Sequence, residues 1–194
     1  MLQRRLSKRK LYFALEPENM EIFLCNGLIG ENMKFRMEHS LPTNADRAWT
    51  LIMGDEFAIQ SYAHSGTQRE LLSEEERGGL IFMKLRIVVE KPLPPLAAKV
   101  IGSSQLSWIQ EQVIDNNKKE MKWKVLIPSA KKVQSEGVFR IESHNDSALR
   151  IVEGTVSVKI PLVGRKVEQH ICKQLEDSYE KSAQFTIDWL RNNP

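Results

Sequence analysis

Apolar and polar residues alternate along several stretches of the chain, which is the pattern of half-buried β-strands. The first stretch, 34–41, places Phe35, Met37 and Leu41 on one side and turns His39 inward with them. Later stretches predict strands at 80–90, 104–115, 120–128, 136–143 and 148–160. Turn-forming residues at 115–118 and 144–147 join neighbouring strands as hairpins, so the sequence predicts an antiparallel sheet.

Two short helices are expected between the first strand and the rest of the sheet. Thr43 to Asp46 have the Thr-x-x-acid form of a capping box, which begins a helix that Gly54 ends. Asp55 then caps a second helix through Tyr62. We interpret the next segment, 73–79, as a turn because it is rich in glutamate and contains two glycines.

One face of the predicted sheet is apolar and therefore needs a cover. Its side chains are Met121, Trp123, Val125, Ile127, Phe139, Ile141, Val152, Val156, Val158 and Ile160. A helix over 164–191 is the one predicted element long enough to lie across it, at ~1.5 Å per residue. The apolar arc of this helix holds Val167, Ile171, Leu175, Tyr179, Phe185, Trp189 and Leu190. The predicted fold class is α+β.

Small residues interrupt both of these apolar surfaces. They are Ser178, Ser182, Ala183 and Thr186 on the helix, and Gly137 and Gly154 on the strands. A close-packed core would use larger side chains there, so this pattern favours a cavity between helix and sheet. The alternative is that Trp108, Trp123 and Tyr179 fill the space that the small residues leave.

Two segments of the sequence resemble a known family. "HSLPTNADRAW" at 39–49 and "VKIPLVGRKVEQHI" at 158–171 are similar to bacterial proteins of unknown function within the START-like, helix-grip (SRPBCC) superfamily. This superfamily includes the birch-pollen allergen, polyketide cyclases and coenzyme Q-binding proteins. The resemblance spans Met33 to Trp189 and implies a curved antiparallel sheet wrapped around the C-terminal helix, with a hydrophobic cavity between them. It divides the chain into a flexible basic extension, 1–32, and a START-like domain, 33–194.

We therefore expect the protein to bind or carry a hydrophobic small molecule, such as a lipid, an isoprenoid or an aromatic compound. The candidate wall residues are His39, Trp123, Phe139, Tyr179, Ser182, Thr186 and Trp189, with the 91–102 loop near the mouth. One alternative is a cyclase- or hydratase-like enzyme that acts on a polyketide-like substrate with His39, Tyr179 or Glu168. Another is a protein-interaction or co-chaperone module. An enzyme needs an acid and a base within ~3 Å of a common point, whereas a binder needs only one or two orienting polar groups.

Three recognisable positions of the family pattern are expected to act structurally. Pro161 ends the last strand because it lacks a ladder donor, and Gly164 lets the chain turn tightly into the helix. Glu168 lies among apolar residues but in the first helical turn, where a carboxylate meets free backbone N–H groups and the positive helix end. We favour an anchoring role for Glu168 over a catalytic one.

The sequence gives no support for a metal, a cofactor or a catalytic nucleophile. It contains no GxSxG elbow and no phosphate-loop lysine, and its four histidines lack metal-ligand spacing. Cys25 and Cys172 are too few for a disulfide scaffold, which favours a reducing cytoplasm. No apolar run approaches the ~20 residues of a membrane-spanning helix.

The formal charge of +3 comes from the N-terminus. Five of the first ten residues are basic, and without them the chain has 23 basic and 25 acidic residues. A folded nucleic-acid-binding face would carry its own positive charge, so we expect no specific nucleic-acid partner. The basic extension is instead suited to transient contact with a membrane surface.

Overall fold

The computed structural model describes residues 32–92, 103–159 and 164–193. Its elements are β1 (Met33–Leu41), α1 (Ala45–Met53), α2 (Asp55–His64), β2 (Thr67–Arg77), β3 (Leu80–Val89), β4 (Ser107–Asp115), β5 (Glu120–Leu126), the short helix η1 (Pro128–Ala130), β6 (Val133–His144), β7 (Ser147–Val158) and α4 (Gly164–Asn192). Nearly all of the predicted extension, most of the 91–102 loop and Pro161 lie outside the described residues.

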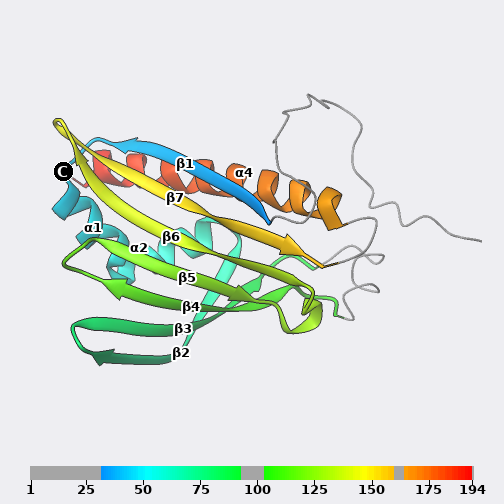
Figure 1. Cartoon of the computed structure of the whole chain (residues 1–194). Coiled ribbons are helices and arrows are strands. Elements are labelled where there is room, and N and C mark those ends of the chain that lie inside the picture. The colour runs from blue at the N-terminus through cyan, green and yellow to red at the C-terminus, as the bar shows by residue number, and fades with distance from the viewer. Residues whose placement is uncertain (1–31, 93–102, 160–163, 194) are drawn as a thin grey trace, which may run out of the picture.

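The seven strands form one antiparallel sheet in the order β1-β7-β6-β5-β4-β3-β2. Strands from β2 to β7 follow one another as hairpin neighbours, and β1 joins the far edge beside β7, where Met37 pairs with Val152. Helix α4 runs behind the sheet along β1 and β7, and α1 and α2 lie behind it near the end of α4 (Figure 1). The predicted α+β class and the long C-terminal helix are confirmed.

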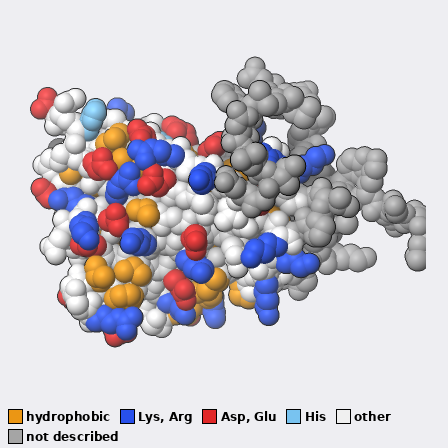
Figure 2. Space-filling view, viewed as in Figure 1, with side chains coloured by type: hydrophobic (Ala, Val, Ile, Leu, Met, Phe, Trp, Pro, Cys, Tyr) orange, Lys and Arg blue, Asp and Glu red, His pale blue; other side chains and the backbone are white. Residues whose placement is uncertain are grey.

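The two faces of the sheet differ in chemistry as the alternation predicts. We call the face toward α4 the inner face and the other the outer face. The inner face supplies most of the core, including Phe35, Trp123, Phe139 and Val152. On the outer face, basic and acidic side chains are intermixed (Figure 2). Arg36 and Arg140 there both bind Glu153.

Three local expectations are wrong. Asp55 is the first residue of α2 and not its cap, which is Gly54. Segment 73–79 is mostly strand, because Ser73 to Arg77 pair with Lys84 to Leu80 and only Gly78 and Gly79 make the turn. This strand is at the sheet edge and exposed along nearly all its length, so it lacks the alternation that marks a half-buried strand. The cap of α1 is Asn44, whose Oδ1 accepts a hydrogen bond from Arg47 N at 2.9 Å, and not Thr43.

Helix α4 covers the part of the inner face that β1 and β7 form. It packs chiefly against β1 and β7, and it also contacts α2. Cys172, Ala183, Thr186 and Leu190 are buried on it. Ser178, which we placed on the inner arc, is exposed, because the buried stripe is narrower than the helical wheel suggests. In the described part of the chain, no helix is long and apolar enough to cross a membrane.

Candidate functional site

The two strand glycines do not open a cavity, contrary to expectation. The strand register places Phe35, Gly154, Gly137 and Trp123 side by side on four neighbouring strands. The Phe35 and Trp123 rings stack over the glycines, with centroids 6.2 Å apart and planes at 22°. A Cβ at Gly137 would lie 2.1 Å from Glu153 O and 2.7 Å from the Trp123 ring. At this row the aromatic rings fill the space.

Elsewhere the inner face is not sealed by the helix. Many apolar side chains that point inward keep part of their surface accessible, although they pack on the buried core. On the strands these are Met33, Met37, Ile81, Met83, Met121, Val125 and Val133, and on α4 they are Val167, Ile171, Leu175, Tyr179 and Ile187. The facing surfaces of sheet and helix are therefore apolar and, at these positions, only partly buried.

Among the described residues, Arg150 is the one fully buried arginine, and it lies in this apolar interior. It projects from the inner face of β7, where it pairs across the sheet with His39 of β1, and only 4% of its surface is exposed. Its guanidinium carbon lies 5.7 Å from the Phe139 ring centroid and 5.6 Å from that of Tyr179. Nη2 donates a hydrogen bond to Ser182 Oγ at 3.3 Å, whereas Nε and Nη1 have no partner among the described residues.

Arg150 remains charged at neutral pH despite its surroundings. Burial lowers its pKa to about 10, and the nearby Tyr179 and Glu180 act in the opposite direction. No carboxylate forms an ion pair with it in the part of the chain that the structure describes. A buried cation without an ionic partner is energetically unfavourable, so its retention at this position requires a reason.

His39 points inward as predicted and lies beside the arginine. Its side chain is 9% exposed, and Nε2 lies 3.2 Å from Glu180 Oε2, while Nδ1 is buried without a partner. Burial lowers its pKa, the positive charge of Arg150 lowers it further, and Glu180 acts in the opposite direction. His39 is therefore neutral at neutral pH, and Arg150 is the positive charge of this region.

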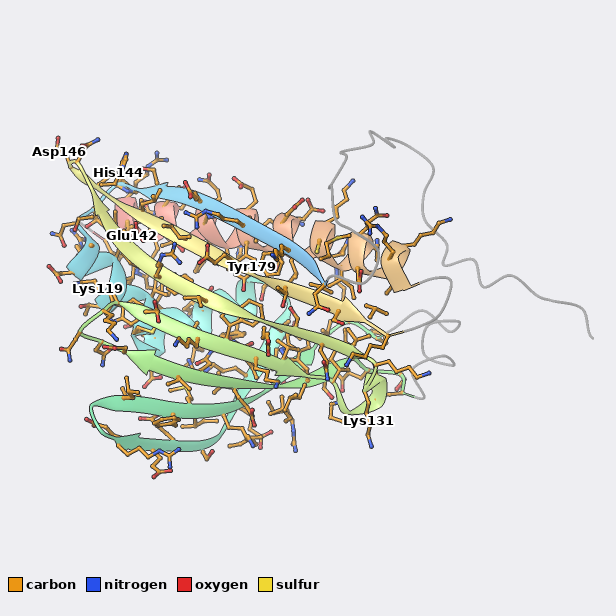
Figure 3. The ribbon with its side chains drawn as sticks, viewed as in Figure 1. Lys119, Lys131, Glu142, His144, Asp146 and Tyr179 are labelled. Carbon is orange, nitrogen blue, oxygen red and sulfur yellow. The ribbon has the colours of Figure 1, made fainter. Side chains whose placement is uncertain are left out.

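Tyr179 completes the polar group from the helix side. It lies midway along α4, behind the sheet, whereas the labelled residues of the β6–β7 hairpin lie at the tip of the sheet (Figure 3). Burial raises the pKa of its hydroxyl to about 12, although Arg150 opposes this. A phenol with this pKa stays protonated at neutral pH and is a weak acid, which is unfavourable for acid catalysis.

The remaining predicted wall residues do not form one group. Phe139 and Ser182 lie beside Arg150. The Thr186 hydroxyl donates to Ser182 O at 2.8 Å, so it is bound to its own helix. Trp189 is separate from them, because it packs with Phe57 of α2 and Phe185 in an aromatic cluster between the helices.

Sequence reasoning missed Arg150. A signal for it was present, because Arg150 shares the parity of Ala148, Val152 and Gly154 in a strand whose inner face is otherwise apolar or small. An arginine at such a position interrupts the alternation. It was overlooked because the apolar residues on either side of it make that stretch of the strand read as buried on both faces.

The start of α4 is held by backbone and carboxylate contacts. Glu168 Oε1 accepts a hydrogen bond from Val158 N at 2.8 Å, so the carboxylate joins the first turns of α4 to the end of β7. We expected the free N–H groups of the helix itself as partners. Gly164 is buried, and a Cβ on it would lie 2.4 Å from Val158 O. Glycine is therefore needed at this position because two backbone segments approach each other closely.

Comparison with known proteins agrees with this geometry. A family model described as "Protein of unknown function (DUF2505)" matches residues 36–190. The chain belongs to this family. A search of the curated proteins found no match. Within the described residues of this DUF2505 protein, no group of three or more histidine, cysteine, aspartate or glutamate side chains could hold a metal ion.

Solved structures show that the DUF2505 chain has the START-like helix-grip fold. A START superfamily protein from Mycobacterium smegmatis has a TM-score of 0.56 and 17% identity, covering 81% of this chain and 98% of that one. Ara h 8.0201 has a TM-score of 0.55 and 10% identity over 81% and 99%. The Zhui aromatase/cyclase from Streptomyces sp. R1128 has a TM-score of 0.54 and 12% identity over 81% and 90%. At these identities the likeness concerns the fold alone.

Proposed function

We propose that this protein binds a hydrophobic small molecule, such as a lipid, an isoprenoid or an aromatic compound, between the inner face of the sheet and α4. The observation that carries the proposal is the lining of half-buried apolar side chains on strands and helix that face one another. In a close-packed core such side chains would be buried, because each buried Å² of apolar surface contributes about 25 cal/mol. A bound apolar molecule would cover the same surface.

The polar groups of the interior support a binding role. Small-molecule sites are mostly apolar and contain a few polar groups that fix the orientation of the ligand. Arg150, His39 and Ser182 are such groups, and they lie together at one place on the inner face. Two of the structural neighbours, a START superfamily protein and an aromatase/cyclase, share the fold in which this arrangement is built.

An enzyme acting on a polyketide-like substrate is the second candidate. One observation favours it, because neutral His39 with an unpartnered Nδ1 could accept a proton beside the fixed charge of Arg150. The missing element is an acid, since the raised pKa of Tyr179 makes it a poor donor. Turnover that is lost in His39→Gln would establish this second candidate in place of simple binding.

The binding proposal is tested with an uncharged, environment-sensitive dye such as Nile red. The folded wild type should enhance the dye's fluorescence. Val125→Trp, on the inner face of β5, should bind the dye several-fold more weakly because the larger ring takes up space beside the lining. The matched control is Lys124→Trp, the same substitution on the adjacent outward-facing residue, which should bind as the wild type does.

Two results would contradict the proposal. One is an absence of fluorescence enhancement by folded wild type, with no co-purified small molecule in native mass spectrometry. The other is an equal loss of dye binding in Val125→Trp and Lys124→Trp, which would place the dye outside the inner face. Circular dichroism and thermal melts of both variants show that they are folded.

A further inference from the structure

The buried polar atoms that lack a partner all belong to the inner face. In the described residues these atoms are on four side chains: His39 on β1, Trp108 on β4, Trp123 on β5 and Arg150 on β7. The indole and guanidinium nitrogens can only donate hydrogen bonds. Since nearly all buried polar groups in proteins find a partner, an interior with several free donors is suited to a ligand that brings acceptors.

Arg150 is the strongest of these groups. It is the only one of the four that carries a charge at neutral pH, and it is 4% exposed, so water does not solvate it freely. The nearest acidic side chain that influences it is Glu180, whose carboxylate is 76% exposed and contacts His39 instead. The guanidinium is therefore neither paired nor solvated within the described residues.

From this arrangement we infer that the ligand is an amphipathic monoanion, an apolar body with one carboxylate, and that Arg150 binds the carboxylate. This inference rests on the proposed binding function and adds the class of the ligand. The planar guanidinium offers several N–H donors that match carboxylate geometry, and such charge-assisted bonds are about twice as strong as neutral ones. The apolar body would lie along the half-buried lining of the interior.

The single charge decides between anion classes. Arg150 is the one buried cation among the described residues. The basic residues around it on β1, β6 and β7 project outward, and His39 is neutral. Arg69, on the inner face of β2, is already paired with Asp55 at 3.4 Å. One positive charge balances one carboxylate. A phosphate monoester carries close to two negative charges at neutral pH and would leave one of them buried without compensation.

The surroundings of the guanidinium also fit this geometry. Phe139 and Tyr179 place their rings at 5.7 and 5.6 Å from its carbon, which limits its movement, and Ser182 holds Nη2. A pre-positioned donor group loses little conformational entropy when a ligand binds. The guanidinium is therefore held in position before a ligand arrives, but its free nitrogens are closed off from solvent, so a neighbouring side chain has to move to admit the carboxylate.

The test compares ligands that differ only in the head group. Dodecanoic acid, dodecyl alcohol and dodecyl phosphate are used, below their aggregation limits, to displace Nile red from the full-length protein at pH 7. We expect the acid to bind on the order of tenfold or more tightly than the alcohol, and more tightly than the phosphate. In Arg150→Met, which keeps an apolar side chain of similar length, the advantage of the acid over the alcohol should disappear while the dye still binds.

Arg140→Met is the matched control. Arg140 is on the neighbouring strand but on the outer face, paired with Glu142 and Glu153, so the acid should keep its advantage in this variant. Equal binding of acid and alcohol by the wild type would overturn the carboxylate inference while leaving the proposed function intact. Preference for the phosphate would overturn the single-charge assignment. Failure of dye and all three ligands to bind would instead overturn the proposed function.

The inference can be tested even if Arg150→Met does not fold. The comparison of acid with alcohol in the wild type requires no variant, and thermal melts provide a second measurement. Dodecanoic acid should raise the wild-type melting temperature more than dodecyl alcohol does at the same free concentration. An equal shift from both would count against the carboxylate.

Discussion

Arg140 on β6 and Arg150 on β7 are on neighbouring strands of one sheet, but they project from opposite faces. On the outer face, Arg140 lies 2.6 Å from Glu153 and 2.7 Å from Glu142, and these hydrogen bonds raise its pKa. On the inner face, Arg150 has a single hydroxyl contact, and burial lowers its pKa to about 10. A buried charge without an ionic partner is unfavourable for folding, which is why we propose a ligand-binding role for Arg150.

The inner face itself has two parts. At the Phe35–Trp123 row the rings cover the glycines and the face is full. Around Arg150 the neighbouring Phe139, Ile141 and Val152 are buried, and several donor atoms have no partner among the described residues. The following predictions test whether these parts, and the two faces, differ as described.

The largest effect is expected at the filled row. Gly137→Val would place a Cβ within 2.1 Å of Glu153 O and 2.7 Å of the Trp123 ring, and backbone cannot move aside cheaply. We expect a loss of about 3 kcal/mol or more in the free energy of unfolding, measured by urea denaturation. Ser135→Val, two residues along the same face, is the control with a smaller expected loss. A Gly137→Val protein as stable as the wild type would mean that the row is open.

The next prediction concerns Glu168, which joins the first turns of α4 to the end of β7. In Glu168→Leu, the Val158 N–H loses its acceptor, and we expect a loss of about 2 kcal/mol. Glu168→Gln keeps an acceptor oxygen and should cost about 1 kcal/mol. Dye binding should change little in either variant. A Gln variant that is fully stable but inactive toward an identified ligand would make Glu168 a functional residue.

The outer face should respond weakly and in a salt-dependent way. Glu153→Gln removes the carboxylate that Arg36 and Arg140 share, and these arginines hold the pKa of that carboxyl below its usual range. Because the side chain is 35% exposed, solvent screening limits the loss to about 1 kcal/mol or less. The difference from wild type should shrink in high salt. A larger loss that is unaffected by salt would mean that this pair is shielded like a buried one.

The smallest effect concerns the pKa of His39. Removal of the nearby positive charge in Arg150→Met should raise this pKa toward the ordinary value of 6.5, measured by NMR titration of the histidine ring. A His39 pKa that is unchanged by Arg150→Met would show that the two side chains are not close neighbours in solution.

The lowered pKa of His39 also predicts how the stability of the folded protein depends on pH. The folded chain binds the His39 proton less readily than the unfolded chain does, because its pKa is lowered. The stability that His39 contributes is therefore present above pH 6.5 and is lost as the pH falls through the folded-state pKa. Wild type should lose stability more steeply than His39→Gln over this interval. Parallel stability curves for the two proteins would contradict the lowered pKa.

Much of the fold could be predicted because each signal is local. The alternation around Met121 to Ile127 fixes which side chains point inward, and the 3.6-residue period of 164–191 fixes the long helix. The edge strand β2 was not predicted, because a strand exposed on both faces has no alternation to read. Of the candidate site, His39, Phe139, Tyr179 and Ser182 were named from the sequence, whereas Arg150 was not.

The sequence by itself determined the elements, the two faces of the sheet and the inward direction of His39, because these depend on the spacing of residues along one strand or helix. Only the tertiary structure decided which residues are neighbours across strands. It brought Trp123 and Phe35 over the two glycines, closing the space that the glycines seemed to open. It also placed Arg150 opposite His39 and close to Tyr179, where no carboxylate of the described residues forms an ion pair with it. Whether a charge is paired depends on contacts between segments far apart in the chain, so no local pattern could reveal it.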